Sequence, residues 1–290
     1  NIFMHTAKEL EKETSYTYFG ARYYDSELSG WLSVDPLSDE RRWVSPYSYC
    51  QNSPVMRVDQ TGALDGDFIS ESGKYLGNDG INDGKVYVVK TTQTSANTHK
   101  DENPATTFAG ISTSERDATE SFISANSGNT EAFKNNDIAY KNCVEIVGDA
   151  NLRQGMVDIV NQDDGRRKIS NPSNNREFGG NIENGAIIPA TPSPIGNVKV
   201  SGELTIVFLA NGPSFHSHPS GSYSPMVDFN TMGQSITRNF WYQSPSPSDI
   251  RNAGSRTNYV FGRGNGIVYI YNSQGVQATI PQKYFVNPKR

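Results

Sequence analysis

The stretch from Phe215 to Gly221 reads FHSHPSG and holds His216 and His218, two of the four histidines in the chain. If this stretch is extended, the alternation of side chains along a strand places both imidazoles on one face, about 6.5–7 Å apart at their Cα atoms. Two imidazoles at that separation can bind one metal ion, and an Asp from downstream would supply a third ligand. Three protein ligands plus water form the open arrangement of catalytic zinc.

A second short motif follows downstream, where residues Ser246–Asp249 read SPSD. Together, the two motifs resemble the signature H-x-H-P, spacer, S-x-x-D of the JAB/MPN metalloproteases, also called JAMM. The resemblance covers the chain from about residue 130 to its end. It implies a curved mixed sheet flanked by helices, a zinc ion held by His216, His218 and Asp249, and a separate upstream Glu.

The upstream glutamate is expected at Glu177, because residues 177–180 read EFGG and resemble the E-x-x-G segment of that family. Glu183 and Glu203 are its rivals, and neither stands in an E-x-x-G context. As an alternative, Glu177 is simply a surface charge.

The spacer between the second histidine and Asp249 departs from the family pattern. Here thirty residues, 219–248, intervene where the family has a much shorter loop. Tripling a flexible loop adds only about 1 kcal/mol of closure entropy, so an insertion at 222–244 is tolerable. Asp228 is the competing third ligand, although no S-x-x precedes it.

The resemblance also implies a mechanism, which these residue types allow. Zinc would lower the pKa of its water towards about 7. Glu177 would take the proton as water attacks a peptide or isopeptide carbonyl, and the Ser246 hydroxyl could donate to the oxyanion. Manganese or iron would also suit these nitrogen and oxygen donors, but the family favours Zn²⁺. In the plainer alternative, the histidines are ordinary polar residues of a strand or loop, and Asp249 only lies in the first turn of a helix, where a carboxylate is favoured.

The N-terminal part has a different character, with aromatic residues alternating with small polar ones between Gly and Pro. Its motifs read YTYFGARYYD at 16–25, GWLSVDP at 30–36, WVSPYSYCQNSP at 43–54 and VDQTGAL at 58–64. This composition predicts short strands and tight turns. Residues 16–64 closely resemble the end of the Rhs repeat-associated core domain, a β-shell followed by a variable C-terminal effector. The resemblance implies that the rest of the shell lies upstream.

The Rhs family often cleaves its own chain just after this segment with paired aspartates. Asp35 and Asp59 match those positions, and Leu64 is the possible cleavage site. Two carboxylates that share a proton can act as acid and base on a peptide bond. In the alternative, both aspartates cap turns. The family usually has Pro where Gln60 stands.

Composition limits the remaining function classes. The 290 residues are 35% hydrophobic with a net charge of −5, and they lack the basic stripe of a nucleic-acid-binding protein. No apolar run reaches the length of a membrane span. Cys50 and Cys143 are expected to be buried free thiols, since two distant cysteines make no disulfide framework.

The expected fold class is α+β, in three parts: the Rhs segment at 1–64, a hairpin and linker at 65–110, and the JAB/MPN-like domain at 111–290. The hairpin would pair residues 73–77 with 85–90. Helices are expected over 118–125, from 130 and over 152–160, with an apolar stripe of helical spacing from 133 to 147. Strands are expected at 178–188, 198–200, 204–209, 215–218, 258–261, 266–271 and 277–280. A turn at Asn211–Gly212 would lead into the histidine strand, and Ser248 would cap a short helix over 249–253.

Two functions are consistent with the sequence. The first is a zinc peptidase or isopeptidase that forms the effector, or a self-processing domain, of an Rhs-type polymorphic toxin. Its partners would be a protein substrate such as a ubiquitin-like conjugate, the upstream Rhs shell and an immunity protein. Such a protein would be secreted or delivered from a cell surface and would act in a target cell. The alternative is a non-catalytic MPN-like docking module attached to the shell.

Overall fold

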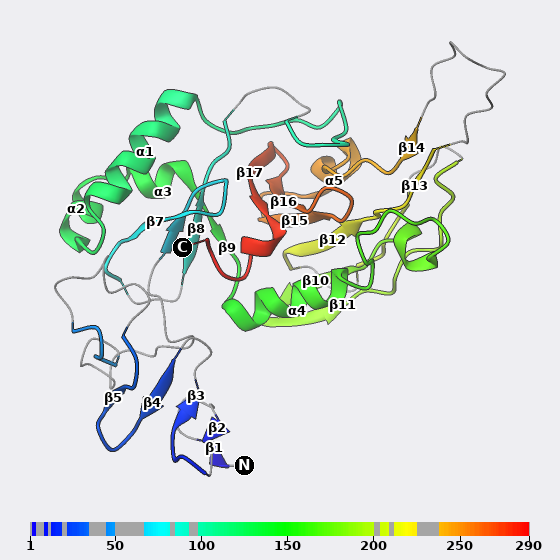
Figure 1. Cartoon of the computed structure of the whole chain (residues 1–290). Helices are drawn as coiled ribbons and strands as arrows, with labels where there is room; N and C mark the ends of the chain where they lie inside the picture. Colours follow the sequence, from blue (N-terminus) through cyan, green and yellow to red (C-terminus); the bar gives the residue numbers. More distant parts are fainter. Residues whose placement is uncertain are drawn as a thin grey trace.

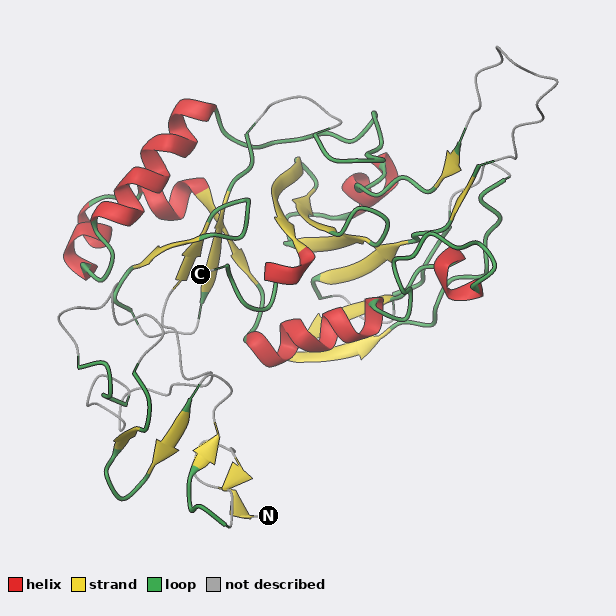
Figure 2. Ribbon diagram, in the orientation of Figure 1, coloured by secondary structure: helices red, strands yellow, loops and turns green. Residues whose placement is uncertain are grey.

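The structure is a computed structural model that describes residues 2–3, 9–10, 13–18, 22–34, 45–49, 67–81, 85–92, 98–199, 204–208, 212–224 and 238–289. The fold is mixed α and β, with several sheets and few helices (Figures 1 and 2). This agrees with the expected fold class at that level. No helix in the described part of the chain combines the length and apolarity that a bilayer crossing needs.

The N-terminal residues form an antiparallel sheet of their own. Its strands, in the order of their pairing, are β1 Ile2–Phe3, β2 Glu9–Leu10, β3 Thr17–Tyr18, β4 Tyr23–Asp25 and β5 Gly30–Trp31. Trp31 and Tyr49 are buried against Tyr24, and the Arg22 guanidinium lies 4.4 Å from the centre of the Trp31 ring. The prediction of short strands and tight turns is confirmed here. Asp35, Asp59 and Leu64, the proposed self-cleavage residues, lie outside the described residues.

A four-stranded sheet follows, in the order β7-β6-β8-β9. Its strands are β6 Asp67–Ile69, β7 Tyr75–Asn78, β8 Val86–Val89 and β9 Cys143–Ile146. The predicted hairpin is wrong in its pairing. Strand β7 pairs antiparallel with β6, and β8 pairs parallel with β6. The residues at 67–69 are too few to show a strand period, so the sequence did not reveal β6 as the central partner.

Strand β8 carries apolar residues on both faces of this sheet. Val86 and Val88 join the main core, whereas Tyr87 and Val89 join a second cluster with Phe68 and Phe133. Three helices, α1 Thr113–Ala125, α2 Thr130–Asn135 and α3 Ile138–Asn142, contribute to the second cluster. The stretch 65–110, expected to be a hairpin and a linker, therefore shares sheet and core with the C-terminal part.

The helical spacing expected for the apolar stripe at 133–147 is only partly correct. It runs through α2 and α3, but its last residues form β9, which pairs antiparallel with β8 from Cys143 to Ile146. Helix α1 also begins earlier than expected, because Ser112 and Glu115 form a capping box.

The site is carried by a six-stranded sheet with the order β11-β10-β12-β15-β16-β17. Its strands are β10 Gly179–Glu183, β11 Ala186–Pro189, β12 Ser214–His218, β15 Asn258–Gly262, β16 Ile267–Asn272 and β17 Gly275–Pro281. All neighbours are antiparallel except β12 and β15, which run parallel. The chain between these two strands therefore crosses over the sheet.

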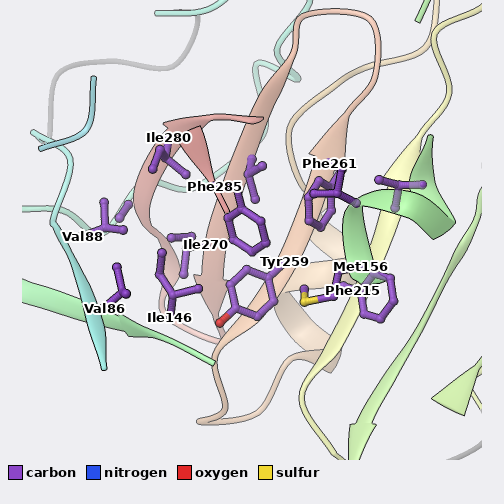
Figure 3. Packing of buried hydrophobic residues seen from close by; sticks show 14 of the residues in the cluster. Val86, Val88, Ile146, Met156, Phe215, Tyr259, Phe261, Ile270, Ile280 and Phe285 are labelled. Atoms are coloured by element: carbon purple, nitrogen blue, oxygen red, sulfur yellow. The ribbon is translucent and has the colours of Figure 1, made fainter. Parts of the chain in front are cut away.

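Opposite faces of this sheet pack on different helices. Helix α4, Ala150–Val160, buries Met156 and Val160 against Phe215, Tyr259 and Phe261, in the core of Figure 3. Helix α5, Pro247–Asn252, buries Ile250 on the other face with Val260, Tyr269 and Tyr271. The alternation of β15 explains the division, since Tyr259 and Phe261 point to α4 and Val260 points to α5.

Three smaller elements complete the described chain: the 3-10 turns Pro172–Asn175 and Gln282–Tyr284, and the hairpin of β13 Ser222–Tyr223 with β14 Asn239–Phe240. The predicted strands at 198–200 and 204–209 are wrong where they are described. Val198 lies in a turn, and residues 204–208 make a single bridge from Val207 to Thr191. Asn211 of the expected hairpin turn lies outside the described residues.

Candidate metal centre

Strand β12 brings the two imidazoles together, as its alternation predicted. Phe215 points into the core under α4, so His216 and His218 face the opposite side, toward α5. Their Nε2 atoms lie 3.3 Å apart. Both side chains are buried, with residue exposures of 2% for His216 and 7% for His218.

Asp249 lies on the same side, despite the thirty-residue spacer. Its Oδ1 is 3.5 Å from the Nε2 of His216, and its Oδ2 is 3.5 Å from the Nε2 of His218. The three side chains that the sequence proposed as ligands therefore converge on one point from two elements, β12 and the first turn of α5.

The position of Asp249 is fixed by a capping box at the start of α5. The Ser246 hydroxyl accepts a hydrogen bond from the Asp249 backbone N–H at 3.1 Å, and the Ser246 backbone N–H donates to Asp249 Oδ2 at 2.7 Å. The helix therefore begins at Pro247 and is capped by Ser246, which corrects the expectation that Ser248 caps it. Ser246 aims Asp249 at the histidines, and its proposed role as an oxyanion donor stays a prediction.

Removing the Ser246 hydroxyl should weaken this helix start. We expect Ser246→Ala to lower the free energy of unfolding by about 1 kcal/mol, because an uncapped N-terminus leaves a backbone N–H without its partner. Denaturant unfolding in a chelator will measure this, so that metal binding does not contribute. Ser246→Asn, which keeps a capping oxygen, should retain most of the stability; equal losses in both variants would contradict the capping role.

Glu177 lies two residues before the first residue of the neighbouring strand, β10. In the β10–β12 ladder, Gly179 pairs with His216, so Glu177, two residues earlier, falls beside His218 on the same face. One oxygen of Glu177 and one nitrogen from each histidine lie within 4.8 Å of one another. The Glu177 backbone N–H donates to Ser193 Oγ at 2.8 Å, and its carbonyl accepts from the Ser193 N–H at 3.0 Å. Glu177 is 6% exposed, which contradicts its alternative as a surface charge.

The glycine after Phe178 is required by this close pairing. A Cβ on Gly179 would lie 2.1 Å from the carbonyl oxygen of Phe215 and 2.9 Å from the Cβ of His216. Any side chain at 179 would therefore push β10 away from the histidine strand, and Glu177 with it.

The second nitrogens of the two histidines differ in their surroundings. His218 Nδ1 lies 2.9 Å from the carbonyl oxygen of Tyr242, which can only accept, so Nδ1 carries a proton whether the ring is neutral or charged, and Nε2 is the atom that faces the centre. His216 Nδ1 is buried and has no hydrogen-bond partner among the described residues.

This donor set fits a zinc ion. Zinc with bonds of about 2.0–2.1 Å in a tetrahedron has its ligand atoms about 3.3–3.4 Å apart. The separation of 3.3 Å between the two imidazole nitrogens is close to such an edge. Each of these nitrogens lies 3.5 Å from a different oxygen of the Asp249 carboxylate, so either oxygen can supply the third ligand atom. Two Nε2 atoms that face each other in a buried site also need a cation or a proton between them, because both lone pairs otherwise repel.

Burial and charge set the protonation states. Desolvation lowers the pKa of His216 to about 4, so this imidazole is neutral and ready to bind a metal. Burial also acts to lower the pKa of His218, but Asp249 and then Glu177 outweigh it, and the pKa is raised. Burial acts to raise the pKa of Asp249, but the two histidines and Ser246 hold it well below its usual range. In the metal-free centre, His218 is therefore the imidazole whose raised pKa favours an added proton, on Nε2.

At a pH below the raised pKa of His218, zinc binding should release about one proton from the ligands, because His218 must lose its Nε2 proton to bind, whereas His216 and Asp249 have none to lose. Isothermal titration calorimetry in buffers of different ionisation enthalpy will measure the number. The zinc affinity should rise as the pH rises towards the raised pKa of His218, and it should level off once the pH is above that pKa. A release near zero at pH 6.5, with His218 intact, would contradict this assignment.

The centre lies in the wall of a cavity of about 1020 Å³, which also borders Ser246. Leu204, Phe208 and Trp241 supply apolar surface to this cavity, and the ring of Phe208 lies 6.0 Å from that of His216. A cavity of this size can admit a segment of another polypeptide beside the centre.

The rival residues do not converge on this site in the described structure. Glu183 ends β10 and is exposed. Glu203 and Asp228 lie outside the described residues. His99, outside the site, makes an edge contact to the ring of Tyr269 at 6.2 Å.

Sequence reasoning missed the residues that support the site through hydrogen bonds to the segments that carry it. Buried Asp163 accepts from the backbone N–H and the hydroxyl of Ser220, at 2.6 Å and 2.5 Å, and fixes the loop after His218. Burial raises the pKa of Asp163. The Tyr242 carbonyl and the Ser193 hydroxyl were missed as well. A single sequence carries no signal for such partners, since each is remote along the chain or acts through its backbone.

Comparison with known proteins gives little guidance. No family model matches the chain, and no solved structure matches it. A segment of 62 residues is 34% identical to part of salivary gland surface protein 1 of Aedes aegypti; this is 21% of the present chain and 2% of that protein. Since the likeness spans so small a share of the relative, it carries no activity or partner over to this chain.

Proposed function

We propose that this protein is a zinc-dependent peptidase or isopeptidase. The observation that carries the proposal is the convergence of His216, His218 and Asp249 at 3.3–3.5 Å, with Glu177 beside the imidazoles. A mixed sheet with a helix on each face agrees with the resemblance of FHSHPSG and SPSD to the JAB/MPN metalloproteases. The parallel β12–β15 crossover carries Asp249 back to the histidines.

The roles of the residues follow from their positions. Zinc bound here would supply a water of pKa near 7 and polarise the scissile carbonyl. His216 and His218 present their Nε2 lone pairs, and Asp249 supplies a carboxylate oxygen. Glu177 takes the proton of the attacking water and returns it to the leaving amine. Ser246, which borders the cavity, is the candidate donor to the oxyanion.

The resemblance of residues 16–64 to the Rhs core extends this proposal to the whole chain. We propose that the peptidase is the C-terminal effector of an Rhs-type polymorphic toxin and acts on a protein in a target cell, where a cognate immunity protein would block it. Expression of wild type and His218→Ala in a sensitive cell without an immunity protein tests this extension. Toxicity of wild type alone supports it, and equal growth of the two strains argues against it.

The enzyme and the docking module differ in two measurable properties. Purified protein reconstituted with zinc should bind about one equivalent, and incubation with a mixed protein extract should create new N-termini or release isopeptide-linked chains. Mass spectrometry reads both products. Failure to bind added zinc would favour the docking module, and zinc binding without any cleavage would leave a structural metal site.

A further inference from the structure

The carbonyl of Tyr242, which accepts the Nδ1–H of His218, belongs to the segment that returns from the insertion. Gln243 follows it directly and is 2% exposed. The Gln243 Nε2 donates to the carbonyl oxygens of Trp241 at 2.6 Å and Pro219 at 2.9 Å, and its Oε1 accepts from the Gly264 N–H at 2.5 Å. The amide orientation is forced, because two carbonyls face one end and an N–H faces the other.

These bonds connect the residue before Tyr242 with the residue after His218. Pro219 is the residue after His218, and Trp241 is the residue before Tyr242. One side chain therefore ties together the two backbones whose distance sets the His218–Tyr242 hydrogen bond. The Gln243 backbone N–H, which donates to the Asp101 carbonyl at 2.8 Å, and the third bond to Gly264 anchor this link to two further segments.

The side chain of Gln243 is tightly packed. A Cβ on Gly264 would lie 2.9 Å from the Cδ of Gln243, and one on Gly262 would lie 3.0 Å from its Cβ. The amide thus packs directly on the turn after β15. A shift of Gln243 would move either this turn or the Tyr242 carbonyl.

We propose that Gln243 is the positioning residue of the metal centre, and that it acts through Tyr242 to hold His218 in the Nδ1–H tautomer with Nε2 toward the ion. The proposal rests on the proposed function for its catalytic meaning, although the hydrogen-bond geometry itself does not require a metal. The proposal also assigns a role to the C-terminal end of the insertion at 222–244. This end supplies the Tyr242 carbonyl, which accepts the hydrogen bond of His218, a ligand that precedes the insertion. Outer partners of metal-bound histidines commonly contribute about 10–100-fold to metal affinity.

Gln243→Met tests this, since it keeps length and volume but removes all three side-chain bonds. Zinc affinity, measured by competition with a chromophoric chelator, should fall about 10-fold or more. In metal-free protein, the hydrogen-bonded Nδ1–H resonance of His218 in the proton NMR spectrum should disappear or exchange rapidly. Gln243→Glu, which keeps the acceptor for Gly264 and loses only the two donations, should give the same two changes and serves if the Met variant fails to fold.

Gln277→Met is the matched control. Gln277 is also buried, at 8% exposure, and its Nε2 donates to the Gly275 carbonyl and to Asn272 Oδ1 in and beside β17, away from the centre. It should lose stability without a change in zinc affinity or in the His218 signal. Equal zinc affinities in wild type and Gln243→Met, or equal losses in both Met variants, would overturn the proposal. If wild type binds no zinc, the proposed function fails, and the His218 signal alone decides the role of Gln243.

Discussion

His218→Ala is expected to lower zinc affinity on the order of a thousandfold, equivalent to about 4 kcal/mol. The substitution removes one of two nitrogen ligands and leaves only His216 at 3.5 Å from the carboxylate of Asp249. Two remaining protein ligands cannot form the three-ligand site of a catalytic zinc. Competition with a chromophoric chelator will give the affinity, and metal analysis after dialysis will give the stoichiometry.

His99→Ala is the matched control for this prediction. His99 is partly buried and contacts an aromatic ring, as His216 does, but it lies outside the cluster. It should bind zinc as wild type does. Wild-type affinity in His218→Ala would show that the ion, if any, binds elsewhere, and would remove the basis of the proposed function.

Glu177→Gln should separate chemistry from metal binding. Glutamine has the same shape and keeps both backbone bonds to Ser193, but it cannot take a proton from water. We expect kcat to fall by about 100- to 10,000-fold, the usual contribution of a general base, with zinc stoichiometry unchanged. The cleavage rate of any substrate identified from the protein extract will measure the loss.

Glu183→Gln provides the comparison, because Glu183 ends β10, the strand that Glu177 precedes, but is exposed. It should retain wild-type activity. If Glu177→Gln instead lost its zinc, Glu177 would be a ligand, and the base would have to be sought elsewhere. If it kept full activity, the proposed mechanism would be wrong.

The sequence predicted the elements that a local pattern of residues marks clearly. The H-x-H spacing located β12, short apolar runs between Gly-rich turns located β15, β16 and β17, and a short apolar segment ended by Asp163-Asp164-Gly165 located α4. It failed for β6 and β9. The three residues of β6 are too short to show a period, and β9 continues an apolar stripe begun by helices, so only its partner β8 marks it as a strand.

Local patterns predicted the parts of the site, whereas its assembly was expected only from the resemblance to the JAB/MPN signature. The two imidazoles share a face by local geometry alone, whereas the approach of Asp249 depends on a crossover whose path no local pattern encodes. Gly179 and Ser193, which place Glu177, act by close backbone approach and a single hydrogen bond. Such contacts appear only when the tertiary structure brings the segments together.

The parallel pairing of β12 with β15 has a consequence for biosynthesis. His216 and His218 precede the crossover, Asp249 lies within it, and the docking of β15 closes it. Contacts between segments so distant along the chain form late in folding. A nascent chain would therefore display only a weak two-histidine site, and the competent centre would arise when the last strands have docked. Tight metal binding would then be possible only after the protein has folded.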